Sequence, residues 1–135
     1  MRLWYYKLIP ALPNKMLVAQ WRECIAIKRQ WEKGTLKHRL VSYVMNYDKS
    51  YFVAYTLQVI AELENRHINY DKNLWKEILK MTDGKFSGNN YPEHNDRYLD
   101  QCFFNLQEKY DRGIITKEDY QKILDIAYKQ TRKDV

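Results

Sequence analysis

Six residues near the start of the chain recur at the spacing of one helix face. They are separated by four, three, four, three and four positions: Lys15, Ala19, Arg22, Ala26, Arg29 and Lys33. Residues at this spacing project to one side of an α-helix. The four cations, here called the basic ridge, have only small side chains between them, so a phosphate backbone could approach closely. We expect the basic ridge to bind a polyanion. A solvated basic surface without a partner is the alternative.

Glu23 is the only acid in the first 31 residues. Its neighbours three and four positions away along a helix are uncharged: Ala19, Gln20, Ala26 and Ile27. The common intrahelical ion pair is therefore not available to it. An acid beside an anion-binding surface lowers affinity, and its presence is easier to understand if the carboxylate takes part in chemistry. A solvated surface glutamate and a tertiary salt bridge are the alternatives that the pattern leaves open.

Positive charge is concentrated in the first third of the chain. Residues 1–46 hold nine cations and two acids, or +7, whereas the remaining 14 cations and 15 acids give −1. Lys37 and Arg39 continue this charge beyond the basic ridge. Twelve tyrosines and four tryptophans offer rings that can stack on exposed bases, although we expect most of them to fill the core. Charge and aromatic content together indicate a nucleic-acid partner.

The elements that must position these residues are expected to be helices. The chain has 135 residues, 45% of them apolar, with four glycines and three prolines. Such a composition argues against a β-sandwich, which needs frequent Gly/Pro turns. We predict an all-α fold, a compact single-domain bundle of about five or six helices over 1–135. An extended arm is predicted at 1–13, and a loop at 83–92. Helices are predicted at 15–33, 37–46, 50–66, 72–82, 97–112 and 116–131. Residues 111–135 are expected to form a C-terminal helical extension.

Capping signals and apolar spacing support these boundaries. Predicted caps are Asn14 and Gly34 for the first long helix, Asn95 or Asp96 and Gly113 for the fifth, and Thr116 with Asp119 for the last. The first helix should bury Leu17, Trp21, Cys24 and Ile25. The short helix should carry Leu40, Val41, Val44 and Met45, and the next should turn Phe52, Leu57, Ile60, Ala61 and Leu63 inward.

Several site classes find no support in the sequence. Cys24 and Cys102 are too few and too far apart for a disulfide framework, so we expect a reducing, cytoplasmic location. No apolar run reaches the length of a membrane span. The side chains of His38, His67 and His94 lack metal-ligand spacing, so we expect no metal site. We also expect no cofactor, no membrane partner and a monomer. His94, within Glu93–Asp96, belongs either to a second acid/base cluster or to a loop that leads into a helix cap.

The chain resembles the pyrimidine-dimer DNA glycosylases of the phage endonuclease V type, in a bacterial branch. The residues that carry the resemblance are Arg2 in the N-terminal arm, Leu12, Leu17, Ala19, the pair Arg22-Glu23, the block 41–49 (VSYVMNYDK), 60–63 (IAEL), 65–69 (NRHIN), and, less securely, Leu106, Glu108 and Lys109. The opening MRLW with the later LIPALP, and 91–96 (YPEHND), are similar to the bacterial branch.

The resemblance implies a compact all-α enzyme that bends duplex DNA at a lesion and flips out a nucleotide. Its nucleophile would be the N-terminal α-amine, which attacks the deoxyribose C1′, displaces the base and forms an imine that permits strand cleavage by β-elimination, without a metal. Arg2 is too bulky for ordinary methionine removal, so the α-amine of Met1 takes this role, whereas the family typically uses a threonine. Glu23 would support the sugar chemistry, and Arg2, Arg22 and Lys109 would contact double-stranded DNA. A catalytically silent helical nucleic-acid-binding protein on the same scaffold is the alternative.

Overall fold

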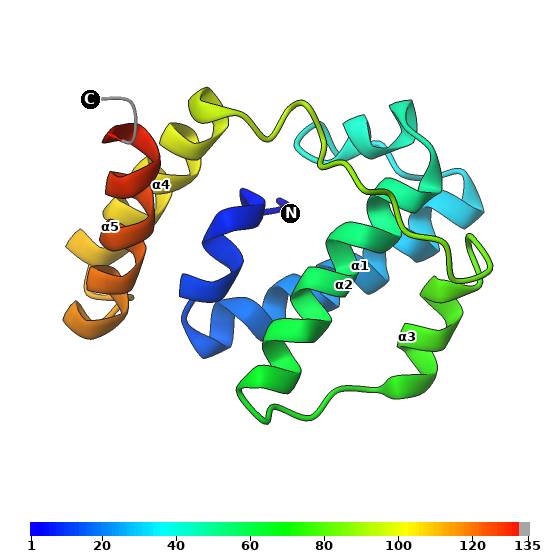
Figure 1. The fold of residues 1–135 in the computed structure, drawn as a ribbon, viewed down its shortest axis with the longest axis horizontal. Coiled ribbons are helices and arrows are strands. Elements are labelled where there is room, and N and C mark those ends of the chain that lie inside the picture. The colour runs from blue at the N-terminus through cyan, green and yellow to red at the C-terminus, as the bar shows by residue number, and fades with distance from the viewer. Residues whose placement is uncertain (133–135) are drawn as a thin grey trace.

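The computed structural model describes residues 1–132, with side chains described to Tyr128 (Figure 1). This part of the chain contains five α-helices, two 3₁₀-helices and no β-strand, which confirms the predicted all-α bundle. The last three residues of the predicted extension, 133–135, lie outside the described residues. In chain order the elements are η1 (Tyr6–Ala11), α1 (Asn14–Lys33), η2 (Ser42–Asn46), α2 (Lys49–Asn65), α3 (Lys72–Leu79), α4 (Asp96–Asp111) and α5 (Lys117–Arg132).

The sequence predicted an extended N-terminal arm over residues 1–13, but the arm is extended only in part. Residues 1–5 have no regular structure, but Tyr6–Ala11 forms the 3₁₀-helix η1. Leu8, Ile9 and Ala11 are buried, because η1 packs between α2 and α5. Buried backbone amides need partners, and the short turn supplies one at Leu8, whose N–H donates to the Tyr5 carbonyl at 2.8 Å. The arm is therefore an internal part of the bundle.

The predicted helix at 37–46 is wrong over its first half. Only Ser42–Asn46 is helical, as the 3₁₀-helix η2, and the preceding residues form a turn in which the His38 carbonyl accepts from the amides of Val41 and Ser42. Val41 and Val44 are buried as expected, whereas Leu40 and Met45 are exposed. Two buried side chains in ten residues do not give a helix enough apolar contact to form.

The inward face of α2 is also rotated from the prediction. Phe52, Ile60 and Leu63 are buried, but Leu57 and Ala61 are exposed. Their places in the core are taken by four other side chains: Val53, Tyr55, Thr56 and Val59. The physical reason is that α2 packs against α1, η1 and η2 at once, so its buried face is set by three neighbours and not by one apolar stripe.

Most predicted helix ends agree with the structure. Gly34 follows α1 in the left-handed conformation, with φ 70°, the Asn95 side chain accepts from the Tyr98 amide at the start of α4, and Thr116 Oγ1 accepts from the Asp119 amide at 3.2 Å. Asn14 is not the N-cap of α1, because Pro13 occupies that position and Asn14 is the first helical residue.

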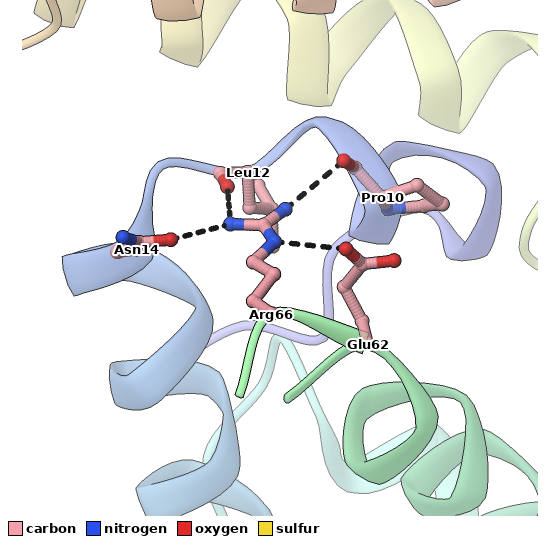
Figure 2. A network of polar contacts seen from close by, with 5 residues as sticks. All are labelled: Pro10, Leu12, Asn14, Glu62 and Arg66. Carbon is pink, nitrogen blue, oxygen red and sulfur yellow. Dashed lines mark hydrogen bonds and ion pairs between the residues drawn. The ribbon is translucent and has the colours of Figure 1, made fainter. Parts of the chain in front are cut away.

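The corner between η1 and α1 is held by Arg66, just after α2 (Figure 2). Its Nη1 donates to the Leu12 carbonyl at 2.6 Å and to Asn14 Oδ1 at 2.9 Å. Its Nη2 donates to the Pro10 carbonyl at 2.9 Å, and its Nε pairs with Glu62 at 2.8 Å. This network joins the arm, the start of α1 and the end of α2, and it uses the Asn14 side chain that the sequence suggested as a cap.

The N-terminus lies in the middle of the bundle, between the α4–α5 pair and the α1–α2 pair (Figure 1). Helix α3 contacts α1 on the far side from the α4–α5 pair. No helix of the described residues is long and apolar enough to cross a membrane. The fold therefore presents the first residues of the chain to α1 and α4, where the candidate site is found.

Candidate active site at the N-terminus

The arm is attached to α1 through the side-chain amide of Gln20. This residue is 1% exposed. Its Oε1 accepts from the Trp4 amide at 2.7 Å and from the Tyr55 hydroxyl at 2.9 Å. Its Nε2 donates to the Arg2 carbonyl at 2.8 Å and to Glu23 Oε2 at 2.9 Å. A single buried side chain thus joins the backbone of residues 2–4 to the carboxylate one turn further along α1.

Glu23 lies directly beside Arg2, the second residue of the chain. Its Oε2 accepts from the backbone N–H of Arg2 at 3.2 Å as well as from Gln20. Covalent geometry then places the α-nitrogen of Met1 within about 7 Å of that oxygen. Glu23 is half-buried, and it forms no ion pair with any side chain that the structure describes. The carboxylate is therefore partly shielded from solvent and hydrogen-bonded, with no salt bridge to a described side chain.

The side chain of Arg2 packs against α4. Its Nη1 lies 4.0 Å from Cys102 Sγ, and its Cζ lies 5.6 Å from the Trp4 ring centroid and 6.0 Å from that of Tyr98. The Tyr98 hydroxyl donates to the Leu3 carbonyl. Lys109, in the last turn of α4, is half-buried, and within the described part of the chain no hydrogen bond or ion pair joins its side chain to the arm. The structure thus brings Arg2 to Glu23 but does not bring Lys109 there.

The basic ridge lies on the solvent side of α1. Its four cations, Lys15, Arg22, Arg29 and Lys33, are all exposed, and none forms an ion pair with another described residue. Lys28, by contrast, is 13% exposed and pairs with Glu32 at 2.7 Å and Glu77 at 3.7 Å. Lys37 and Arg39 are exposed in the turn that follows α1. Glu23 is one position, about 100° around the helix, from Arg22, so the carboxylate lies at the edge of this ridge.

His94 lies in the core and not at the surface of a site. Its Nδ1 accepts from the Tyr6 amide at 3.3 Å, so its Nε2 carries the proton and donates to the Tyr43 hydroxyl at 2.7 Å. Six tyrosine rings surround it, with centroids 4.9 to 6.2 Å away: Tyr5, Tyr6, Tyr43, Tyr55, Tyr91 and Tyr98. Burial lowers the pKa of His94 to about 4. The neutral imidazole joins η1 to η2, and Asn95 beside it caps α4.

Other chemical groups near the arm are poor nucleophiles. Cys24 and Cys102 are buried free thiols. Burial raises the pKa of Cys24 to about 12 and also raises the pKa of Cys102. Both thiols therefore remain protonated at neutral pH, and a protonated thiol is a weak nucleophile. Within residues 1–132 no three His, Cys, Asp or Glu side chains are grouped closely enough to hold a metal ion.

Sequence reasoning missed Gln20, Tyr55 and Tyr98, which hold the arm in place. A signal for Gln20 existed, because it falls within the buried stripe of α1 between Leu17 and Cys24. A polar side chain on such a stripe must find hydrogen-bond partners in the core. Neither tyrosine carries a comparable signal, since a buried tyrosine is common and its partner is a distant backbone carbonyl.

Comparison with known proteins covers the part of the chain that contains this site. Residues 1–76, more than half of the chain, match the model of a protein family described as pyrimidine dimer DNA glycosylase. No curated protein and no solved structure matches. The matched segment contains the arm, α1 with Gln20 and Glu23, and α2 with Tyr55, whereas α4 and α5 lie beyond it.

Proposed function

Because the chain belongs to the pyrimidine dimer DNA glycosylase family, we propose that it cleaves pyrimidine-dimer-like lesions in duplex DNA as a glycosylase with AP lyase activity. The observation that carries this mechanism is the 3.2 Å hydrogen bond from the Arg2 amide to Glu23 Oε2. It joins Arg2, the residue that follows the proposed nucleophile, to the only acid in the first 31 residues of a strongly basic segment. A nucleophile and a group able to move protons then stand together.

The proposed nucleophile is the α-amine of Met1. Its lone pair attacks C1′ of the damaged nucleotide, and the C1′–base bond breaks with its electron pair going to the base, which is protonated as it leaves. Opening of the sugar ring yields a protonated imine between the α-nitrogen and C1′. Loss of a proton from C2′ expels the 3′ phosphate, and water hydrolyses the imine.

Glu23 contributes to these reaction steps in two ways. Its negative charge stabilises the positive charge that develops at C1′ and then on the imine nitrogen. Its carboxylate also accepts and returns protons during ring opening and elimination. The half-buried position beside Arg2 suits both roles, because electrostatic interactions strengthen away from bulk water.

The basic ridge binds the DNA backbone in this proposal. Its cations lack competing acidic partners among the described residues, and they follow one face of α1 towards Lys37 and Arg39. Contacts of this kind orient the duplex without reading its sequence. Glu23, at the edge of the ridge, would then face the sugar of the flipped nucleotide.

The decisive experiment blocks the N-terminus. Protein with a free α-amine is compared with protein extended by a few residues at the N-terminus, and with a matched control that carries the same extension at the C-terminus. Each is incubated with abasic-site duplex and borohydride, which reduces an imine to a stable adduct. We expect adducts, mapped to residue 1 by peptide mass analysis, only when the α-amine is free.

Three outcomes would contradict the proposal in different ways. An adduct on Lys7, Lys15 or Lys109 would retain the lyase chemistry and remove Met1 as its nucleophile. Equal cleavage by the N-terminally extended protein would exclude an α-amine mechanism. Absence of any adduct, with DNA binding retained, would favour a catalytically silent nucleic-acid-binding protein on the same scaffold.

A further inference from the structure

We infer that Gln20 is a positioning residue, an inference that rests on the proposed function. The buried amide of Gln20 sets the position of the N-terminal α-amine relative to the Glu23 carboxylate. Of the described side chains, it is the one that hydrogen-bonds both to the arm backbone and to Glu23. Its loss would leave the direct hydrogen bond of 3.2 Å from the Arg2 amide to Glu23 without the support of a second, buried connection. The role is thus separable from that of Glu23 itself.

The orientation of the Gln20 amide is determined by its partners. The Trp4 N–H can only donate, so it faces the amide oxygen, and the Arg2 carbonyl can only accept, so it faces the amide nitrogen. A glutamine amide has two N–H donors and two main acceptor positions. All four are used, by Trp4, Tyr55, Arg2 and Glu23. Neither a carboxylate nor an apolar side chain of similar size reproduces this set.

Two tyrosines hold the same segment from other sides. The one hydroxyl proton of Tyr55 is shared between the Trp4 carbonyl at 2.6 Å and Gln20 Oε1 at 2.9 Å, and the Tyr98 hydroxyl donates to the Leu3 carbonyl. Residues 2–4 have no regular secondary structure, so these side chains take the place of the backbone partners that a helix or sheet would provide. Tyr55 and Tyr98 fix the arm, whereas Gln20 fixes the arm relative to Glu23 and supports the direct hydrogen bond from the Arg2 amide to Glu23.

The rate of an imine-forming reaction depends strongly on such placement. A displacement of about 1 Å between reacting groups can lower a rate by about a hundredfold. Binding of the duplex by the basic ridge does not pass through Gln20, because the ridge side chains lie on the opposite, exposed face of α1. Loss of the Gln20 contacts should therefore lower the chemical rate much more than the affinity.

The first test replaces Gln20 with methionine, which keeps the side-chain length and removes all four hydrogen bonds. Under single-turnover conditions on abasic duplex, we expect the cleavage rate constant to fall by roughly 30- to 100-fold, with the dissociation constant changed less than about threefold. The matched control is Thr56→Val, which removes a fully buried hydroxyl on α2 that donates to the Phe52 carbonyl at 2.9 Å and also bonds the Cys24 thiol, with no bond to the arm or to Glu23. It should cleave within about threefold of the unmodified protein.

The second test, Gln20→Glu, gives a readout that a merely structural role would not change. When protonated, the introduced carboxyl can donate one hydrogen bond to Glu23 or to the Arg2 carbonyl. When ionised, it places two carboxylates at hydrogen-bond distance, and like charges that close resist joint ionisation. The ratio of variant to unmodified rate should therefore fall at least tenfold as pH rises, with a one-proton dependence. Circular dichroism at each pH measures the folded fraction used to normalise both rates.

The outcomes separate this inference from the proposed function. If the unmodified protein forms no borohydride adduct, the proposed function fails, and the positioning role fails with it. If it forms the adduct, a pH-independent rate ratio for Gln20→Glu overturns the positioning role alone, even where Gln20→Met fails to fold. A Gln20→Met variant that folds and cleaves within threefold of the unmodified protein overturns it as well.

Discussion

Protonation of His94 should destabilise the fold as the solution is acidified. The imidazole is 7% exposed, and its Nδ1 already accepts a hydrogen bond from the Tyr6 amide. Protonation would put a hydrogen on Nδ1, break that bond and place a charge among six rings. Burial accordingly lowers the pKa of His94 from 6.5 to about 4. The unfolded chain therefore binds more protons than the folded one between these two values.

The sign and size of the effect follow from this difference. A base whose pKa is depressed in the folded state contributes stability that is complete above pH 6.5 and is lost as pH falls towards 4. The pKa difference corresponds to about 3 kcal/mol in all, and to about 2 kcal/mol between pH 7 and pH 5. For a chain of this length, 2 kcal/mol lowers Tm by roughly 5–10 °C. The lowered pKa of Asp48 acts at more acidic pH, outside this window.

The assay is urea unfolding followed by circular dichroism at pH 7, 6 and 5. His94→Gln should be less stable than the unmodified protein at pH 7 but should lose most of the pH dependence. The matched control His38→Gln removes an exposed imidazole and should keep that dependence. An unchanged slope in His94→Gln, or an NMR titration of His94 with a pKa between 6 and 7, would refute the reasoning.

Three further predictions concern the basic ridge, Glu23 and the Arg66 network. Arg29→Ala should weaken binding to all duplexes alike and reduce the slope of log affinity against log salt by about one. The control Lys85→Ala should leave the slope unchanged. It removes the same charge, but from the loop that packs on the start of α2. Glu23→Gln should keep abasic-duplex binding and lower single-turnover cleavage by about a hundredfold or more; a normal rate would return Glu23 to a structural role. Arg66→Met leaves the half-buried Glu62 without its ion-pair partner and two backbone carbonyls without their hydrogen-bond donor. It should lower the free energy of unfolding by about 2–4 kcal/mol in urea melts. Arg112→Met, which breaks only an exposed pair with Glu108 at 3.9 Å, should lower it by about 0.5 kcal/mol or less, and equal losses would contradict the importance of the network.

Local features of the sequence predicted the helices well. The long helices α1, α2, α4 and α5 follow apolar spacing and capping residues that act within one or two turns, such as Gly34, Asn95 and Thr116. The exposed positions of the basic ridge follow from the same periodicity, because side chains on the helix face opposite the buried apolar stripe project into solvent. Glu23 was also singled out from the sequence, as an acid with no cation three or four positions away on its helix.

Segments without a strong period were predicted less well. The 3₁₀ conformation of η1 depends on its position between α2 and α5, which no local pattern encodes. The turn before η2 and the rotated face of α2 likewise depend on which neighbours pack there. His94 shows the same limit, since the run 93–96 is compatible with an acid/base cluster as well as with a cap-forming loop. Its enclosure by tyrosines from five parts of the chain distinguishes them.

The sequence by itself determined the residue types on which the proposed function depends: an N-terminal amine, the one glutamate of the first 31 residues and a row of cations at the spacing of one helix face. Only the tertiary structure decided that the N-terminal arm and the glutamate meet, through the Arg2 amide. Residues 2 and 23 are 21 positions apart, and no helical period relates them. Their approach depends on side chains of three helices, Gln20, Tyr55 and Tyr98, each bonded to a backbone group of the arm. Hydrogen bonds between such distant segments form only when the whole bundle has packed.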